Sequence, residues 1–174
     1  MYMLCVVDLV TGMTYLDNIM YVVCNKSPTI RLYNTDTLSP LDVVINITGM
    51  KRPHPHNIVV CYHDRQLYVA DYYYIWRVSV DDHSYVKWLT LSSMGTFHVN
   101  TLSLTSRRLL VTSWPPTLRQ YNTVDSQLLC HIELPQYVQV LYHAVETTRQ
   151  TFVVGHVGTS QDEWKHAVSE LFMM

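Results

Sequence analysis

The chain has 174 residues, of which 48% are hydrophobic and only 15% are charged, so it can bury a substantial core and is not a disordered chain. Its formal net charge of −2 gives no long-range attraction to nucleic acids or acidic membranes, which argues against a protein that binds them through bulk positive charge. Valine, tyrosine, threonine, leucine and isoleucine are abundant, and on average these residues favour β-strands.

The first ten residues, Met1 to Val10, are apolar but carry no basic region and are too short to span a bilayer. We therefore expect no membrane insertion and interpret residues 1–12 as an N-terminal strand or extension. The four cysteines form no C-x-x-C pair, which excludes a zinc ribbon or a thioredoxin-type motif. We expect four buried, reduced thiols and a cytoplasmic protein, with two disulfides as the alternative for a secreted one.

A valine-centred segment recurs along the chain, at residues 18–24, 65–71, 107–113 and 149–155. Its central residues, Val22, Val69, Val111 and Val153, are 47, 42 and 42 positions apart. An interval in the low forties is typical of a four-stranded propeller blade.

Each repeat divides in the same way. An apolar stretch (12–16, 57–61, 99–104, 137–144) is followed by a short polar turn and then by the valine-centred strand. A third, alternating run (30–34, 75–79, 118–122) and a fourth, more polar run (41–47, 85–91, 127–134) complete the first three repeats. The sequence predicts an all-β propeller of about four repeats, with approximate blades at 13–55, 56–97, 98–136 and 137–174. The outermost strand of each blade is expected to be the most polar.

The fourth repeat is incomplete, and two interpretations compete at its end. Ser160 to Glu163 form a capping box, so residues 164–172 could begin a helix with one apolar face. The order of strands in the first three repeats instead predicts a third strand over residues 166–172, and we favour the strand.

The second repeat resembles an NHL repeat. The matching residues are Pro55 to Val60, Gln66 to Asp71 and Ile75 to Val78, which follow the family's order of proline, apolar strand, valine-aspartate core and apolar-basic strand. The resemblance extends over roughly residues 13–172, and no Trp-Asp dipeptide closes any repeat, so the WD-repeat class fits less well. It implies a six-bladed ring like the one that ends tripartite-motif ubiquitin ligases, where the propeller selects proteins or RNA.

The chain contains about three and a half repeats, which is fewer than the six blades of the ring that the resemblance implies. We favour a fragment of a larger ring, and the alternative is that Tyr2 to Leu9 supply the missing outer strand of the fourth blade. An open arc would leave unpaired strand edges through which chains could associate with one another.

The sequence contains few candidate metal-binding or catalytic residues. His54 and His56, with His63 nearby, form its densest histidine cluster, but no third ligand stands at motif spacing, so we expect a solvated loop and no metal site. No carboxylate recurs in the first strands and no G-x-S-x-G elbow occurs, so we predict a non-catalytic protein without a cofactor. A metal-dependent propeller hydrolase is the least favoured alternative.

Loops between the second and third strands, and between blades, bring aromatic and basic residues to one face. Such residues can anchor a protein partner, which is the main hypothesis, or stack unpaired RNA bases, which is the alternative. Trp76 and Trp88 are expected to pack between blades instead, whereas both roles stay open for Tyr73 and Trp114. The candidate residues of this face are Lys51, Arg52, His54, His56, Tyr72, Tyr73, Tyr74 and Trp114.

Overall fold

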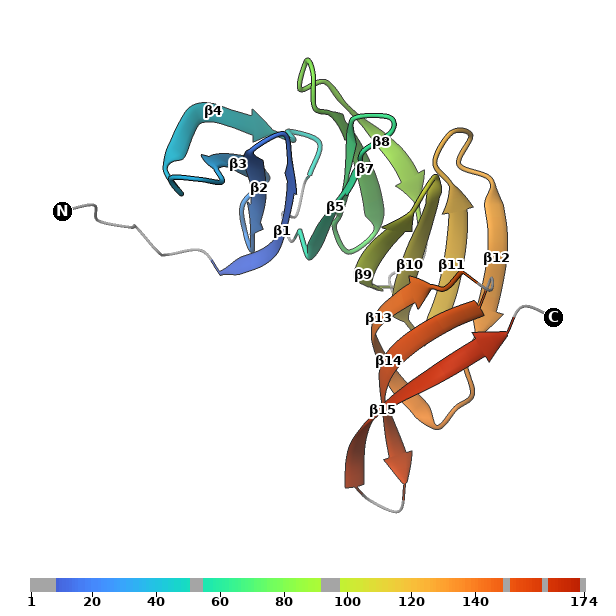
Figure 1. The fold of residues 1–174 in the computed structure, drawn as a ribbon. Helices are drawn as coiled ribbons and strands as arrows, with labels where there is room; N and C mark the ends of the chain where they lie inside the picture. Colours follow the sequence, from blue (N-terminus) through green and yellow to red (C-terminus); the bar gives the residue numbers. More distant parts are fainter. Residues whose placement is uncertain (1–8, 51–54, 92–97, 149–150, 161–162, 173–174) are drawn as a thin grey trace.

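The structure, a computed structural model, describes residues 9–50, 55–91, 98–148, 151–160 and 163–172. Within these ranges the regular elements are all β-strands, and they form three four-stranded sheets and one three-stranded sheet (Figure 1). The predicted all-β architecture, with three full blades and one incomplete blade, is therefore confirmed. The strands of the four sheets are β1 Val10–Leu16, β2 Ile19–Cys24, β3 Thr29–Asn34 and β4 Pro40–Asn46; β5 Asn57–Cys61, β6 Gln66–Ala70, β7 Tyr74–Ser79 and β8 Tyr85–Thr90; β9 His98–Thr105, β10 Arg108–Trp114, β11 Thr117–Asn122 and β12 Leu128–Glu133; and β13 Val138–Glu146, β14 Thr151–Ser160 and β15 Glu163–Phe172.

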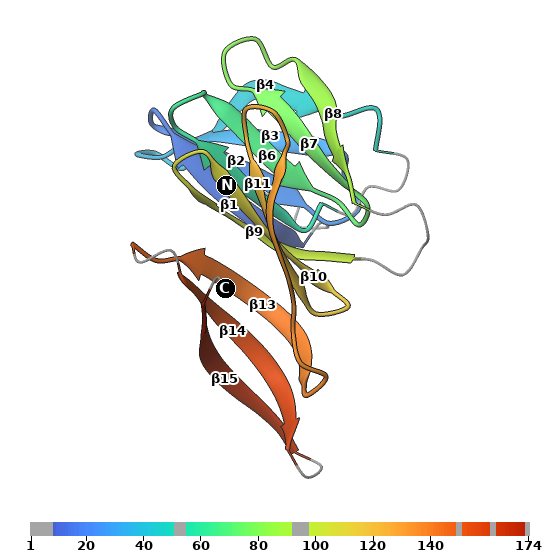
Figure 2. The ribbon, with the colours of Figure 1, turned by 90° about the vertical axis from the view of Figure 1, so that its right-hand side faces the viewer.

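The sheets, numbered here as blades one to four, follow one another around an open arc. Every sheet is antiparallel with its strands in chain order, so each blade is a meander. The first strands, β1, β5, β9 and β13, contact one another in series along the inside of the arc. Figures 1 and 2 both separate the first sheet (blue) from the fourth (orange to red), so the arc does not close on itself.

Hydrophobic cores fill the spaces between successive blades. The blade one–two core includes Leu32, Val69 and Trp76, the blade two–three core is built around Tyr68 and Val111, and the blade three–four core contains Leu118, Phe152 and Val154, all at most 3% exposed. Blades two and three thus bury both faces of their sheets, and the end blades bury one face each. The outer strands β4, β8 and β12 are the most exposed of their sheets, as expected for polar edges.

The backbone conformation of one turn is repeated in the first three blades, although the residues in the turn differ. Between the third and fourth strands of blades one to three, a residue with positive φ donates its N–H to the last residue of the third strand: Leu38 (φ 55°), His83 (φ 59°) and Ser126 (φ 60°). These bonds end on the carbonyl oxygens of Asn34, Ser79 and Asn122, at 2.9, 3.1 and 2.9 Å. Leucine, histidine and serine share no side-chain chemistry, so the repeat here resides in the backbone.

Gly12 brings the inner strands of the first two blades close together. A Cβ at this position would lie 3.0 Å from the Cα of Asn57 and from the backbone nitrogen of Ile58. The absence of a side chain therefore allows β1 to approach β5.

The fourth repeat departs from the predicted register by one residue. Val69 and Val111 pack against the preceding blade, but in β14 it is Phe152 and Val154 that do so, while Val153 points to the opposite side. Side chains alternate along a strand, so a shift of one residue exchanges the two faces. The equivalence of Val153 with the three earlier valines is wrong in this respect.

The end of the chain is a strand. Residues 163–172 form β15, so the strand interpretation of the C-terminal segment is confirmed and the helix interpretation is wrong. Residues 1–8 lie outside the described residues, so the interpretation of the N-terminal segment as a strand stays a prediction there. No helix in the described ranges is long and apolar enough to cross a membrane.

Candidate binding face

The predicted binding residues that the structure describes lie at the ends of strands, and all of them lie at the same end of the blades. His56 precedes β5, Tyr72 lies between β6 and β7, and Trp114 ends β10. These three come together with His98, the first residue of β9, in one aromatic cluster. Lys51, Arg52 and His54 lie outside the described residues.

Ring contacts run through this aromatic cluster in series. The ring centroids of His56 and Tyr72 are 4.4 Å apart, those of Tyr72 and His98 5.1 Å, and those of His98 and Trp114 6.2 Å. The first two contacts are edge-to-face and the third is stacked, which are the geometries that aromatic pairs prefer. The chain thus presents a continuous row of rings drawn from two blades.

The three consecutive tyrosines divide between this cluster and the core. Tyr73 is half-buried at the edge of the cluster, 6.1 Å from Tyr72 and 6.4 Å from His98. Tyr74 turns away and packs against the blade one–two core, with the ammonium of Lys87 3.9 Å from its ring centroid. Tyr74 keeps an edge-to-face contact with Tyr73 at 6.3 Å, but no ring contact joins it to the four residues of the aromatic cluster.

Asp71 holds the tyrosine loop in place. Its carboxylate is only 4% exposed. One oxygen, Oδ1, accepts hydrogen bonds from the backbone N–H groups of Tyr73 and Tyr74 at 2.9 and 2.8 Å, and Oδ2 accepts one from Nε1 of Trp76 at 2.9 Å. This buried aspartate therefore positions the loop and fixes the orientation of Trp76, which is 3% exposed between the blades as predicted. Trp88 is likewise packed, edge-to-face on Tyr68 at 5.0 Å.

Trp114 has a different environment. Its side chain is 46% exposed, and it lies between two hollows of about 410 and 480 Å³. The first hollow is mainly apolar and is lined by His56, Tyr72, His98, Val99, Asn100, Thr101, Trp114, Val140 and Tyr142. The second combines prolines with charged groups and is lined by Trp114, Pro115, Pro116, Thr117, Arg119, His131, Glu133, Leu134, Pro135, Gln136, Val138 and Gln139. An exposed ring between two hollows is suited to an extended ligand that crosses it.

Two of the ring-bearing residues that line the first hollow, His98 and Tyr142, were not among the predicted binding residues. His98 could have been found, because it begins the first strand of its blade, close to where His56 stands just before β5. Tyr142 could not, because it lies at a register shift of β13 between Leu141 and His143. Such a bulge re-aims a side chain, and here Tyr142 stacks on His166 at 5.8 Å.

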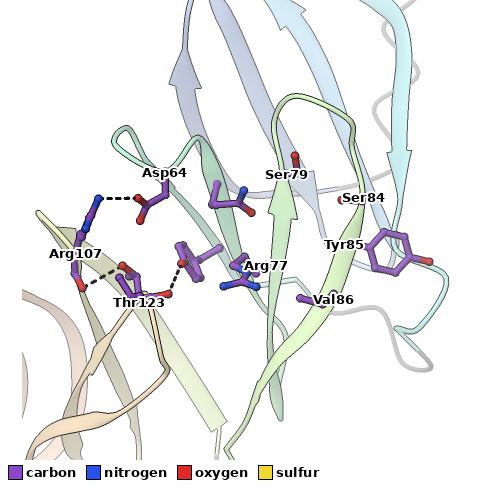
Figure 3. A pocket seen from close by; sticks show the side chains of 11 residues that line it. Asp64, Arg77, Ser79, Ser84, Tyr85, Val86, Arg107 and Thr123 are labelled. Carbon is purple, nitrogen blue, oxygen red and sulfur yellow. Dashed lines mark hydrogen bonds and ion pairs between the residues drawn. The ribbon is translucent and has the colours of Figure 1, made fainter.

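The opposite end of the blades carries a more polar cleft of about 560 Å³ between blades two and three (Figure 3). Arg107 lies 3.3 Å from the carboxylate of Asp64, and the hydroxyl of Tyr68 donates to the carbonyl of Thr123 at 3.4 Å. Burial raises the pKa of Tyr68 to about 12, so its hydroxyl stays protonated at neutral pH. Arg77 also lines this cleft, which the sequence did not predict.

The described residues provide no group of three histidine, cysteine or acidic side chains that could hold a metal ion. A serine–histidine hydrogen bond does occur, between Ser169 Oγ and His156 Nε2 at 2.9 Å. However, His156 is only 5% exposed on the side of β14 that faces blade three, and its Nδ1 has no hydrogen-bond partner among the described residues. The imidazole therefore has little access to solvent, and no carboxylate within the described ranges orients it in the way that nucleophilic catalysis uses.

The expectation of four buried thiols holds for Cys24 and Cys61, and Cys5 lies outside the described residues. Cys61 is fully buried, whereas Cys130 is only half-buried. Burial raises the pKa of both thiols, which keeps them protonated and unreactive.

No protein-family model and no curated protein matches the sequence. The fold, in contrast, is similar to many solved structures. The structure of U3-55K is matched with a TM-score of 0.68 and 14% identity over 92% of this chain and 51% of that one. Hydrazine synthase from Kuenenia stuttgartiensis is matched with a TM-score of 0.74 and 10% identity over 92% and 50%.

The computationally designed protein Ika4 is matched with a TM-score of 0.66 and 11% identity over 94% of this chain and 91% of that one. The chain therefore spans about half the length of the first two solved structures and nearly the whole of the third. Identities this low establish the fold alone, and the NHL type is not confirmed, because the propellers matched include WD40 domains. The chain has the fold of a β-propeller arc.

Proposed function

We propose that this chain is a non-catalytic interaction module that binds a protein partner, as an extended segment, across the face that carries the aromatic cluster. The observation that carries this proposal is the environment of Trp114. A tryptophan that only filled the core would be packed like Trp76, which is 3% exposed, whereas Trp114 is 46% exposed and flanked by hollows on both sides. Exposed tryptophan and tyrosine side chains beside pockets are the residues that most often dominate binding energy at protein interfaces.

The chemistry of the two hollows indicates the kind of segment that fits. The first would take an apolar or aromatic side chain, because its walls include rings and valines. The second would take a polar or charged side chain, because Arg119, His131 and Glu133 line it. Successive side chains of an extended peptide point to opposite sides, so a peptide lying over Trp114 could place an apolar group in the first hollow and a polar group in the second.

A library of random extended peptides, selected against the purified chain, tests this proposal. Peptides that bind should carry an aromatic or large aliphatic residue, and Trp114→Ala should weaken their binding by about 30-fold, the effect of an interface hot spot. Tyr62→Ala is the matched control, since Tyr62 is an exposed aromatic residue (55%) in the hairpin at the opposite end of blade two. Equal loss in both variants, or no loss in either, would contradict the proposed face.

Single-stranded RNA is the second ligand class for the same face, since bases stack on exposed aromatic rings. It is the weaker hypothesis because the net charge is −2. RNA binding that falls steeply with salt and is lost in Arg52→Glu would replace the protein-partner proposal.

Two further assignments are proposals as well. The NHL type is supported by the run from Pro55 to Asp71, and by no other repeat to the same degree. A cytoplasmic location is supported by the buried thiol of Cys61, and imaging of a tagged chain in its source cell tests it.

A further inference from the structure

The first blade exposes an apolar sheet face. On the side away from blade two, Met13, Val22, Arg31 and Val44 form one row across all four strands. Met13 and Val44 are 62% and 55% exposed. At one end of this face, Met13, Met20 and Leu38 help to line a mainly apolar hollow of about 270 Å³.

The same row is buried in the second blade. Ile58, Val69, Trp76 and Lys87 occupy the equivalent positions, and Ile58, Val69 and Trp76 are at most 3% exposed because blade one covers them. The exposed face of blade one is therefore the face with which a blade contacts the blade before it.

The fourth blade exposes the complementary kind of face. Phe152, Val154 and Leu171 pack on blade three, so the alternate residues of β13, β14 and β15 point away from it. Among these, Val145, Val168 and Phe172 are 46%, 73% and 68% exposed. This is the face with which a blade contacts the blade after it.

We propose that a second copy of this chain covers both faces, with the fourth blade of each copy packed on the first blade of the other. The two faces are then buried by the same blade-on-blade contact that already occurs three times within the chain. They also carry opposite charges, Arg31 on blade one and Glu170 on blade four. Because the contact joins two different faces, it is heterologous and must close into a ring or grow into a filament.

The number of blades with which propellers close indicates that the ring contains two copies. Propellers close with about four to eight blades, so two four-bladed arcs give a ring of eight, whereas three arcs would exceed the range. One arc alone does not close, since its end blades lie apart in both views (Figures 1 and 2). An eight-bladed ring differs from the six blades that an NHL resemblance implies, so the two assignments are separable by experiment.

Analytical ultracentrifugation of the purified chain tests the proposal. The expected mass is twice the 20.3 kDa of one chain. Met13→Glu and Gly155→Glu each place a carboxylate on one of the two end faces. A Cβ on Gly155 would meet nothing nearer than 4.0 Å, so this variant should fold as the parent does. Each variant should raise the dissociation constant of the dimer by about 100-fold, because a carboxylate would be buried in the mainly apolar contact between the blades.

Val86→Glu is the matched control. Val86 is as exposed as the end-face residues (49%) but lies on the outer strand of blade two, so its replacement should leave the mass unchanged. Circular dichroism on all three variants confirms that each keeps its strands.

Mixing the two end-face variants identifies the geometry. A mixed pair contains one contact between two unaltered faces and gathers both carboxylates in the other contact. Equimolar Met13→Glu and Gly155→Glu should therefore recover an open dimer, held by the unaltered contact, that neither variant forms alone. A folded chain with the mass of one copy at every concentration would overturn the proposal and leave other blades of a longer polypeptide as the occupant. Filaments, or a dimer indifferent to Gly155→Glu, would overturn it too.

Discussion

At the scale of single residues, Asp71 shows how a polar group can be structural and still serve a binding face. Its buried carboxylate accepts three N–H groups, two from the tyrosine loop and one from Trp76. Each of these donors would otherwise be left without a partner, which is more costly than the bond itself is stabilising.

We expect Asp71→Ala to lower the free energy of unfolding by about 3 kcal/mol, because it leaves buried donors unsatisfied. Urea unfolding followed by tryptophan fluorescence measures the change, at one fixed protein concentration. Asp81→Ala is the control, since Asp81 is exposed and only pairs with Arg65 at 2.7 Å. Loss of that surface pair should cost no more than about 1 kcal/mol. Similar losses in the two variants would refute the role given to Asp71.

At the scale of elements, close approach of strands decides where a side chain is tolerated. Gly12 lies where β1 passes β5, and a methyl group there would be 3.0 Å from two backbone atoms. Backbone cannot rotate aside as a flexible side chain can, so the two inner strands would have to separate.

Gly12→Ala should therefore lower the free energy of unfolding by about 1–3 kcal/mol, the usual cost of overpacking. Thr14→Ala, which leaves an alanine two residues further along β1 by removing a hydroxyl and a γ-methyl group at a half-buried position, should change it by less than about 1 kcal/mol. Thermal unfolding at equal concentration compares them. If Gly12→Ala is as stable as the parent, β1 and β5 are not held as closely as described.

The elements themselves were largely accessible from the sequence, since alternation and turn residues are local. The strands around Val22, Val69 and Val111 were predicted within one or two residues of their bounds. Val153 was assigned to the wrong side and Tyr142 was not predicted at all, because a shift of one residue in β14 and a bulge in β13 exchange faces without changing composition.

At the scale of the whole molecule, the arc distributes stability unevenly. Blades two and three are covered on both sides, whereas each end blade is covered on one, and stacked repeats depend on their neighbours.

Amide hydrogen exchange should follow this distribution. We expect β6 and β10 to exchange most slowly, because nearly all of their residues are buried. The strands β4 and β15 should exchange fastest, since they are the outer strands of the two end blades and each has a neighbouring strand on one side only among the described residues. Ring closure would cover sheet faces but not these edges, so the order holds for one copy or two. Exchange in β4 as slow as in β6 would contradict it.

The sequence by itself determined the strand type, the repeat length and the packing of Trp76 and Trp88, because these depend on local alternation and on hydrophobic side chains spaced along one chain. Only the tertiary structure decided that Trp114 is exposed between two hollows, that Tyr74 leaves the aromatic cluster, and that the end blades present apolar faces. These outcomes depend on which blade lies beside which, and residues such as Trp114 and Tyr142, brought together from different blades, have no common signal along the chain.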